Sequence, residues 1–198
     1  MNPRMKFVLI SFVLLTTITA SSNAQKLHLG LVAGTNMYKV TGRSFDEKFK
    51  PAFSAGVSGE YTINPMMGIQ SELLWNQVIT RTDQDFSQIY PGEGVADADV
   101  YLNYISLPVM FAFKPAPELS ILLGPQYSYL VNQTSGLLIS GKDAFKKNDL
   151  ALVFGGQLNL GKVRVGARYT IGLTEINALQ SDPWKYHGFH FYLGFRLK

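Results

Sequence analysis

Five charged side chains stand out because each lies in a segment where apolar and polar residues alternate. They share the polar faces of those segments, and they are Glu60, Glu72, Arg164, Arg168 and Arg196. A strand points successive side chains to opposite faces, so these charges are expected on the side away from the apolar residues. An isolated charge inside a protein is costly, and such groups must pair or meet water. The set predicts either a closed network of ion pairs or the charged lining of a pore.

Other residue types that could do chemistry give weaker patterns. His187 and His190 are three positions apart, an odd spacing that puts them on opposite faces of a strand and does not suit a shared metal. No serine or aspartate neighbour forms a recognisable catalytic triad. We therefore predict no catalytic, cofactor or metal site and no enzymatic activity, with a lipid-modifying membrane enzyme kept as a less favoured alternative.

A glycine-containing string at residues 156–162 matches the first seven positions of a phosphate-binding loop. Val163 stands where that loop needs a Ser or Thr to reach magnesium, and no helix is expected to follow. Gly161 and Lys162 are instead expected to form a tight turn between two strands.

Eight segments carry the alternating pattern that would have to position the charges. Most are near the roughly 9 to 11 residues that a tilted strand needs to cross a bilayer. The segments are residues 27–37, 51–63, 67–79, 100–113, 119–131, 150–160, 163–173 and 188–198. The connections between them alternate between long (38–50, 80–99, 132–149, 174–187) and short (64–66, 114–118, 161–162). Outer-membrane barrels have short turns on the periplasmic side and long loops outside.

The apolar faces are expected to meet lipid, and the polar faces, which hold most of the glycines, to fill a narrow lumen. Phe154, Val165, Phe191 and Leu193 are placed on the lipid face, so Arg at Val165 should be more harmful than Ser at Gly166. The sequence thus predicts an all-β, eight-stranded, antiparallel up-and-down transmembrane barrel. A secreted soluble barrel of lipocalin type is the alternative in which the apolar faces point inward.

The first 24 of the 198 residues have the features of a secretory signal peptide, with Arg4 and Lys6 ahead of an apolar run and a small-residue cleavage site. We expect export and one barrel domain over residues 25–198. Loss of Arg4 and Lys6 lowers the formal net charge from +4 to +2. No cluster of basic residues with interleaved aromatics is present, so nucleic acid is not an expected partner.

The chain resembles the small outer-membrane β-barrel proteins of Bacteroidetes, often labelled porin family or outer membrane protein β-barrel domain. The resemblance covers essentially all of residues 25–198. The strings that carry it are Tyr104-Ile-Ser-Leu-Pro-Val109, Gly124-Pro-Gln-Tyr127, Gly166-Ala-Arg-Tyr-Thr-Ile-Gly-Leu173 and the closing segment 189–197. It implies a barrel in the bacterial outer membrane and says little about the role of that barrel.

We therefore expect a non-enzymatic, monomeric barrel with a mostly plugged polar lumen and a structural, adhesion or recognition role for its four long loops. The expected partners are outer-membrane lipid, lipopolysaccharide and the outer-membrane assembly machinery, and no cofactor is expected. A small porin that passes ions or small solutes is the main alternative.

Overall fold

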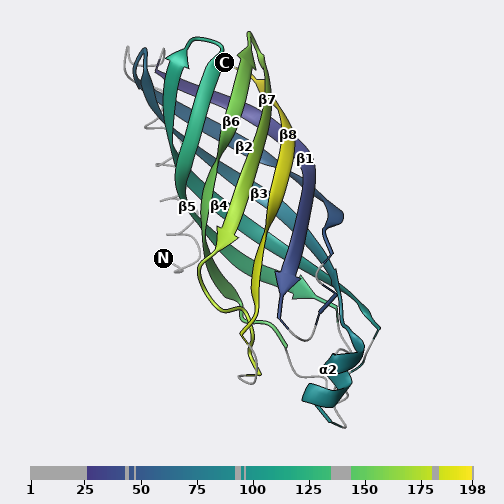
Figure 1. Cartoon of the computed structure of the whole chain (residues 1–198). Coiled ribbons are helices and arrows are strands. Elements are labelled where there is room, and N and C mark those ends of the chain that lie inside the picture. Colours follow the sequence, from purple (N-terminus) through teal and green to yellow (C-terminus); the bar gives the residue numbers. More distant parts are fainter. Residues whose placement is uncertain are drawn as a thin grey trace, which may run out of the picture.

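The described part of the chain is one closed sheet of eight antiparallel strands, each paired with its sequence neighbour, with β8 closing on β1 (Figure 1). This computed structural model describes residues 26–42, 45, 46, 48–91, 95, 97–134, 144–179 and 183–197. The strands are β1 (Leu27–Thr41), β2 (Lys50–Asn64), β3 (Met67–Arg81), β4 (Asp99–Ala116), β5 (Leu119–Gln133), β6 (Asn148–Leu160), β7 (Val163–Gly172) and β8 (Lys185–Arg196), with one short helix, α2 (Gln84–Ile89), between β3 and β4. The predicted eight-stranded up-and-down barrel is confirmed, while the predicted signal peptide lies outside the described residues.

The short turns gather at one end of the barrel and the long connections at the other (Figure 1). We call these the short-turn end and the loop end. In the turn between β6 and β7, Gly161 has φ +64°, a left-handed conformation that glycine adopts without a steric penalty. The string that imitates a phosphate-binding loop is therefore a strand and a hairpin turn, as predicted.

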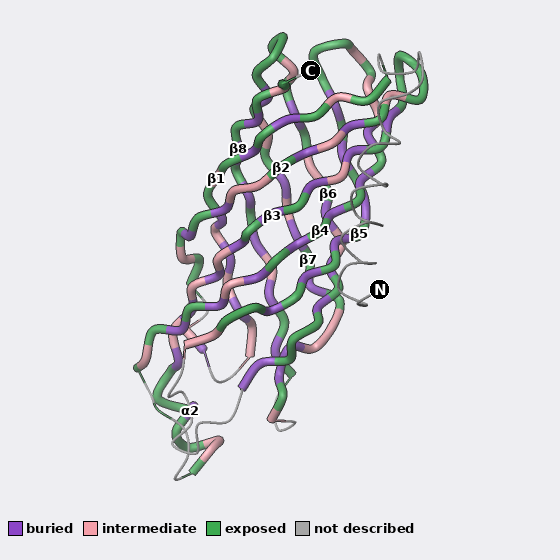
Figure 2. The backbone as a smooth tube through the Cα atoms, turned by 180° about the vertical axis from the view of Figure 1, so that it is seen from behind, coloured by how far each residue is buried: buried purple, intermediate pink, exposed green. Residues whose placement is uncertain are grey.

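Burial alternates along every strand, as the tube in Figure 2 shows. The four side chains predicted to face lipid are all on the outer surface, with exposures from 39% for Val165 to 60% for Leu193. The buried positions between them carry mostly polar or small residues, so the barrel is apolar outside and polar inside. This arrangement excludes the lipocalin alternative, which needs the reverse.

Several strands run further toward the loop end than the sequence pattern predicts, and there the two faces exchange polarity. In β1, Lys39 lies on the outer face while Tyr38 and Val40 are buried. In β8, Lys185 is exposed and Tyr186 is buried. The sequence prediction placed apolar side chains on the outer face, and this holds only within the apolar belt. The predicted strands therefore end earlier at the loop end than the observed strands do.

Candidate functional site: a filled lumen

The middle of the lumen holds a buried cluster around the guanidinium group of Arg168. Its Nη2 donates to Oε2 of Glu72 at 2.8 Å and lies 3.0 Å from Nδ1 of His190. The group also lies over the ring of Tyr192, with Cζ 4.2 Å from the ring centroid. Because Arg168, Gly166 and Arg164 are two positions apart on β7, their Cβ positions all face the lumen. A charged pair with this many polar partners is well satisfied in a low-dielectric interior.

His190 also contacts Ser54, with the serine Oγ 2.7 Å from Nε2. An arginine side chain can only donate, so Nδ1 of His190 accepts from Arg168 and the ring proton lies on Nε2. Nε2 therefore donates to Ser54, whereas a nucleophilic serine needs a histidine nitrogen that accepts its proton. The pair is a structural hydrogen bond in this tautomer.

A second ionic cluster lies at the short-turn end and centres on the carboxylate of Glu60. Nη2 of Arg164 is 3.2 Å from Oε2 of Glu60, and Nη2 of Arg196 is 3.6 Å from the same atom. Lys114 bonds Oε1. The five charged residues of the sequence prediction thus fall into two groups, Glu72 with Arg168 and Glu60 with Arg164 and Arg196.

The sequence did not identify Lys114, because it was assigned to the turn that follows the fourth predicted segment. In the structure β4 continues to Ala116, and Lys114 stands one step beyond the predicted strand end. A two-residue periodicity carried through Met110 and Ala112 would have placed its side chain in the lumen.

Uncharged polar side chains extend the cluster around Arg168 across the lumen. Gln70 donates to Oε1 of Glu72 at 2.8 Å and to Gln157 at 3.3 Å. The hydroxyl of Tyr192 donates to Oε1 of Gln157 at 2.8 Å. The ring of Tyr192 occupies the space next to Gly166, where an added Cβ would lie 2.2 Å from the ring. The glycine is therefore what lets this aromatic ring cross the lumen, and serine at Gly166 should also carry a cost, while its rank below Arg at Val165 stays a prediction.

At the loop end the lumen is filled by apolar side chains that we call the loop-end core. Each long connection contributes to it: Phe45 from the first, Phe86 of α2 from the second, Phe145 from the third, and Ile176 and Trp184 from the fourth. The Trp184 ring centroid lies 4.8 Å from that of Phe45, 5.2 Å from that of Phe145 and 6.2 Å from that of Phe86. The strands add Tyr38, Val40, Val78, Val100, Leu102, Tyr104, Leu130 and Tyr186, and the third connection adds Ala144.

Hydrogen bonds tie the long connections to one another around this core. Phe45 forms an isolated β-bridge with Thr82, and Phe145 forms one with Asn177. The backbone N–H of Lys146, in the third connection, donates to the carbonyl of Ile176, in the fourth, at 2.8 Å. The described parts of the loops therefore form a folded layer across the barrel mouth, which the sequence analysis did not predict.

The charged residues at the rim of the loop end are largely paired. The salt bridges join Lys50 to Asp99 at 2.9 Å, Lys48 to Asp46 at 2.9 Å, Arg81 to Asp97 at 3.7 Å and Lys146 to Glu175 at 3.9 Å. Such exposed pairs contribute little to stability, but each cancels its own field locally. The described rim thus shows a mixed polar surface without a strong charge of one sign.

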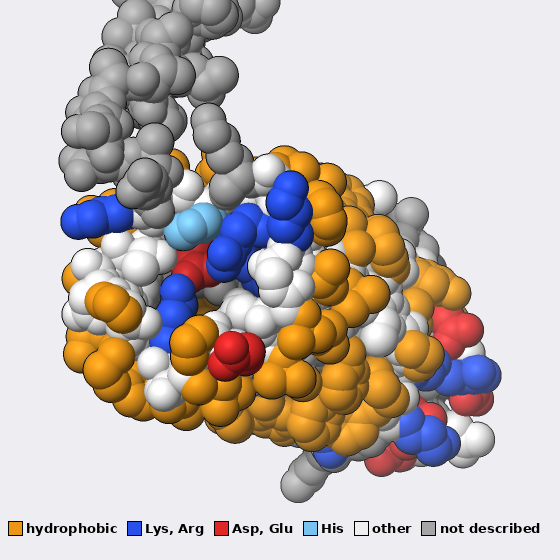
Figure 3. Space-filling model, turned by 90° about the horizontal axis from the view of Figure 1, so that it is seen from above, with side chains coloured by type: hydrophobic (Ala, Val, Ile, Leu, Met, Phe, Trp, Pro, Cys, Tyr) orange, Lys and Arg blue, Asp and Glu red, His pale blue; other side chains and the backbone are white. Residues whose placement is uncertain are grey.

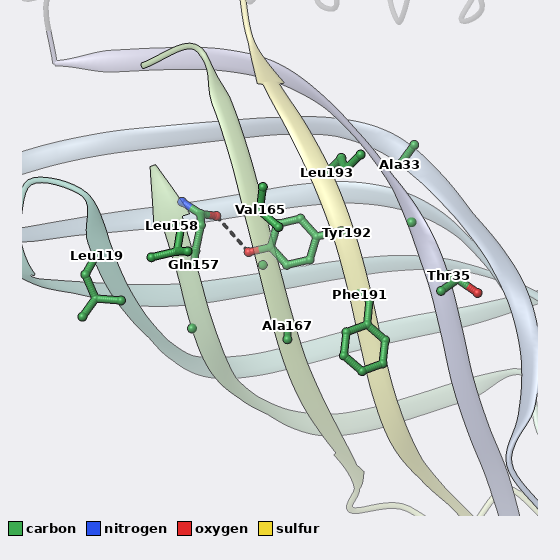
Figure 4. A pocket seen from close by; sticks show the side chains of 13 residues that line it. Ala33, Thr35, Leu119, Gln157, Leu158, Val165, Ala167, Phe191, Tyr192 and Leu193 are labelled. Carbon is green, nitrogen blue, oxygen red and sulfur yellow. Dashed lines mark hydrogen bonds between the residues drawn. The ribbon is translucent and has the colours of Figure 1, made fainter. Parts of the chain in front are cut away.

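On the exterior, a shallow apolar hollow lies over β6, β7, β8 and β1 (Figure 4). It arises where the small outward residues Gly156 and Ala167 lie side by side between Leu158, Val165 and Phe191. The Tyr192–Gln157 hydrogen bond runs behind it on the lumen side. No charged side chain lines the hollow, which suits contact with lipid chains.

The histidines and other possible ligands do not gather into a metal site. His190 is buried in the lumen, whereas the side chain of His187 lies on the outer face near Tyr169 and Phe49. Within the described residues, no group of three or more His, Asp or Glu side chains could hold a metal ion. No helix in the same residues is long and apolar enough to cross a bilayer.

An apolar outer belt, a polar filled lumen and a closed antiparallel sheet define an integral membrane β-barrel. The family model named outer membrane protein beta-barrel domain matches residues 20–177, and the chain belongs to this family of outer-membrane proteins. The Bacteroidetes origin implied by the resemblance remains a prediction.

Two solved structures have a similar fold. The attachment invasion locus protein Ail of Yersinia pestis, in complex with the heparin analogue sucrose octasulfate, is 18% identical, with 87% of this chain and 99% of that chain covered and a TM-score of 0.52. Neisserial surface protein A is 14% identical, with 86% and 97% covered and a TM-score of 0.53. No curated protein matches the chain significantly.

Proposed function

We propose that the protein is a non-enzymatic, closed outer-membrane barrel whose loop end is a rigid platform for adhesion or recognition. The observation that carries this proposal is the loop-end core, to which all four long connections contribute a buried side chain. A channel has no need for such a core, whereas a binding surface gains from loops that are already ordered before contact. The name of the similar Yersinia pestis protein attributes attachment to a barrel of this fold, and we extend that role to this chain.

The orientation we propose puts the short turns in the periplasm and the loop end outside the cell, after export by a signal peptide over residues 1–24. The loop lengths support it, because outer-membrane barrels keep their short turns on the periplasmic side. The barrel would act as a monomer, with outer-membrane lipid and lipopolysaccharide around it, and would be inserted by the outer-membrane assembly machinery. An epitope tag after Pro91 should be reached by antibody on intact cells, and a tag after Lys162 should not.

A small porin is the second candidate, and the polar lumen favours it. The two ionic clusters and the glutamines between them would suit a water-filled path. The loop-end core counts against it, because a path would have to pass Trp184, which has no exposed surface. A lipid-modifying enzyme is less favoured still, since Ser54 accepts a hydrogen bond from Nε2–H of His190, and this nitrogen cannot take the serine proton in that tautomer.

The adhesion role can be tested on cells that display the protein. A variant in which residues 92–94 and 135–143 are replaced by Gly-Ser segments of equal length keeps the loop-end core residues. We expect this variant to lose adhesion to host-cell and glycan surfaces while its gel mobility still changes on boiling, as that of a folded barrel does. Equal adhesion by cells with wild type, variant and empty vector, at matched surface amounts, would overturn the proposal.

A further inference from the structure

A hollow opens at the short-turn end of the lumen, on the face opposite the loop-end core (Figure 3). It has a volume of about 370 Å³, and its lining includes His28, Lys114, Glu118, Asn159 and Arg196. The apolar outer belt surrounds a mouth where basic, acidic and histidine side chains gather, as Figure 3 shows. We call this hollow the vestibule.

The charges at the vestibule do not balance. Glu60 is buried and has three cationic partners, Lys114, Arg164 and Arg196. Glu118 is the acidic residue among those that line the vestibule, and it is exposed to solvent. Even with Glu118 counted, the described groups leave an excess of positive charge around one carboxylate. A concave site with charge of one sign and low-dielectric walls concentrates ions of the opposite sign.

Several side-chain nitrogens near the vestibule also lack a hydrogen-bond partner. Arg164 is 3% exposed, yet its Nε and Nη2 make no well-aligned hydrogen bond to any described residue, although Nη2 is ion-paired with Glu60. The Nε of Arg196 and the Nδ1 of His28 are likewise buried without a partner in the described chain. Unmet buried donors are costly, most of all when they are charged. A bound group with oxygen acceptors would satisfy the arginine donors.

We propose that the vestibule is a binding site for a small oxyanion, a phosphate or carboxylate group, held by Lys114 and Arg196 with Arg164 behind them. Guanidinium and ammonium groups bind such oxyanions through charge-assisted hydrogen bonds, and arginine does so in a bidentate geometry. In the orientation proposed above, the site faces the periplasm, where phosphate occurs free and in lipid headgroups and carboxylates occur in peptides. The site itself depends only on the residues at the short-turn end, so it stands apart from any role of the loop end.

The test is a titration of the folded barrel in uncharged detergent with inorganic phosphate, acetate and glycerol 3-phosphate, each at low ionic strength. Binding is followed by calorimetry and by NMR shifts of the His28 and Asn159 signals. Saturable binding of at least one probe, with shifts at both residues, supports the site. Phosphate alone would indicate the free ion, glycerol 3-phosphate alone a lipid headgroup, and acetate alone a peptide carboxylate.

Charge variants separate the site from general attraction to a basic rim. Lys114→Gln and Arg196→Gln should each weaken binding by about tenfold or more, because each removes a charged hydrogen bond. Lys162→Gln removes the same charge from the adjacent turn, where the side chain is exposed and does not line the vestibule, and should change affinity by about twofold or less. Equal weakening by Lys114→Gln and Lys162→Gln would overturn the proposal.

Glu118→Gln should change the affinity for the probe anions in the opposite direction, and it does not alter a buried side chain. Removing this exposed negative charge from the rim should tighten binding by about two- to fivefold. It also keeps the proposal falsifiable if the Lys114 and Arg196 variants fail to fold, which the heat-dependent gel shift would show. No saturable binding of any of the three probes to wild type, or no gain in the Glu118→Gln variant, would overturn the site.

Discussion

Arg168 shows how much of the lumen one residue organises. Its guanidinium group contacts the carboxylate of Glu72, the imidazole of His190 and the face of Tyr192. His190 in turn forms a hydrogen bond with Ser54, and Tyr192 forms one with Gln157. Most strands of the barrel are thereby linked through a single buried cation, so loss of its counter-charge should disturb the contacts in the middle of the lumen.

Glu72→Ala should lower the free energy of unfolding by about 3 to 5 kcal/mol, less where water reaches the lumen, because it leaves the buried charge of Arg168 without its partner. The measurement is urea unfolding in detergent, followed by the heat-dependent gel shift. Glu118→Ala removes an exposed carboxylate from the short-turn end and should leave the transition unchanged. Equal stability of Glu72→Ala and wild type would mean that the pair is not buried as described.

Gly166→Ala should destabilise the barrel, because the new Cβ would lie 2.2 Å from the Tyr192 ring. Gly59→Ala is the matched control, since its Cβ would meet only a methyl group of Leu29, at 3.7 Å. Replacing Tyr192 by leucine in the Gly166→Ala background should recover part of the loss, because the smaller side chain frees the space. If Gly166→Ala were as stable as Gly59→Ala, the predicted steric clash between the new Cβ and the Tyr192 ring would be wrong.

The eight strands were predictable because each carries a two-residue alternation that depends only on its own sequence. The two-residue period also placed Glu60, Glu72 and the three arginines on the inner face. The loop-end core was not predictable in this way. Phe45, Phe86 and Phe145 lie in connections without a repeating pattern, and only the closed sheet brings them to Trp184. Tertiary contacts between separate connections have no periodic signal in the sequence.

The lipid face of β7 can be tested with arginine at successive outward positions. Val163→Arg, next to the turn, should cost about 0 to 1 kcal/mol of folding free energy. Val165→Arg and Ala167→Arg lie further into the apolar belt, so their cost in folding free energy should rise toward about 2 to 4 kcal/mol. All three side chains are exposed on the exterior, so lumen packing is not affected. The cost is measured by folding into lipid vesicles. Equal costs at the three positions would argue against this placement of β7 in the bilayer.

Trp184→Ala tests the loop-end core as an element. Loss of a fully buried Trp should lower stability by about 3 to 5 kcal/mol and open the long connections to proteolysis. Trp75→Ala is the control, because Trp75 is 43% exposed on the outer face of β3. If limited proteolysis cuts both variants and wild type alike, the connections are not held by this core.

At the scale of the whole molecule, the lumen is interrupted at separate levels. The vestibule is open to solvent, the Glu72–Arg168 pair with its glutamine and tyrosine partners fills the middle, and the loop-end core fills the far end. Eight strands enclose a space just wide enough for side chains, so large residues at each level fill it. Because the middle and loop-end levels differ in chemistry, a substitution at one should leave the other in place.

Conductance in planar bilayers decides between a closed barrel and a small porin. Wild type should show no steady channels, and neither Glu72→Ala nor Arg168→Ala should open one, because the loop-end core still fills the lumen beyond them. A variant that combines Glu72→Ala with Trp184→Ala and Phe45→Ala removes material at both levels and should conduct, provided that its gel mobility shows a folded barrel. Steady, well-resolved channels in wild type, unchanged by Glu72→Ala or Arg168→Ala, would refute the closed lumen and establish the porin alternative.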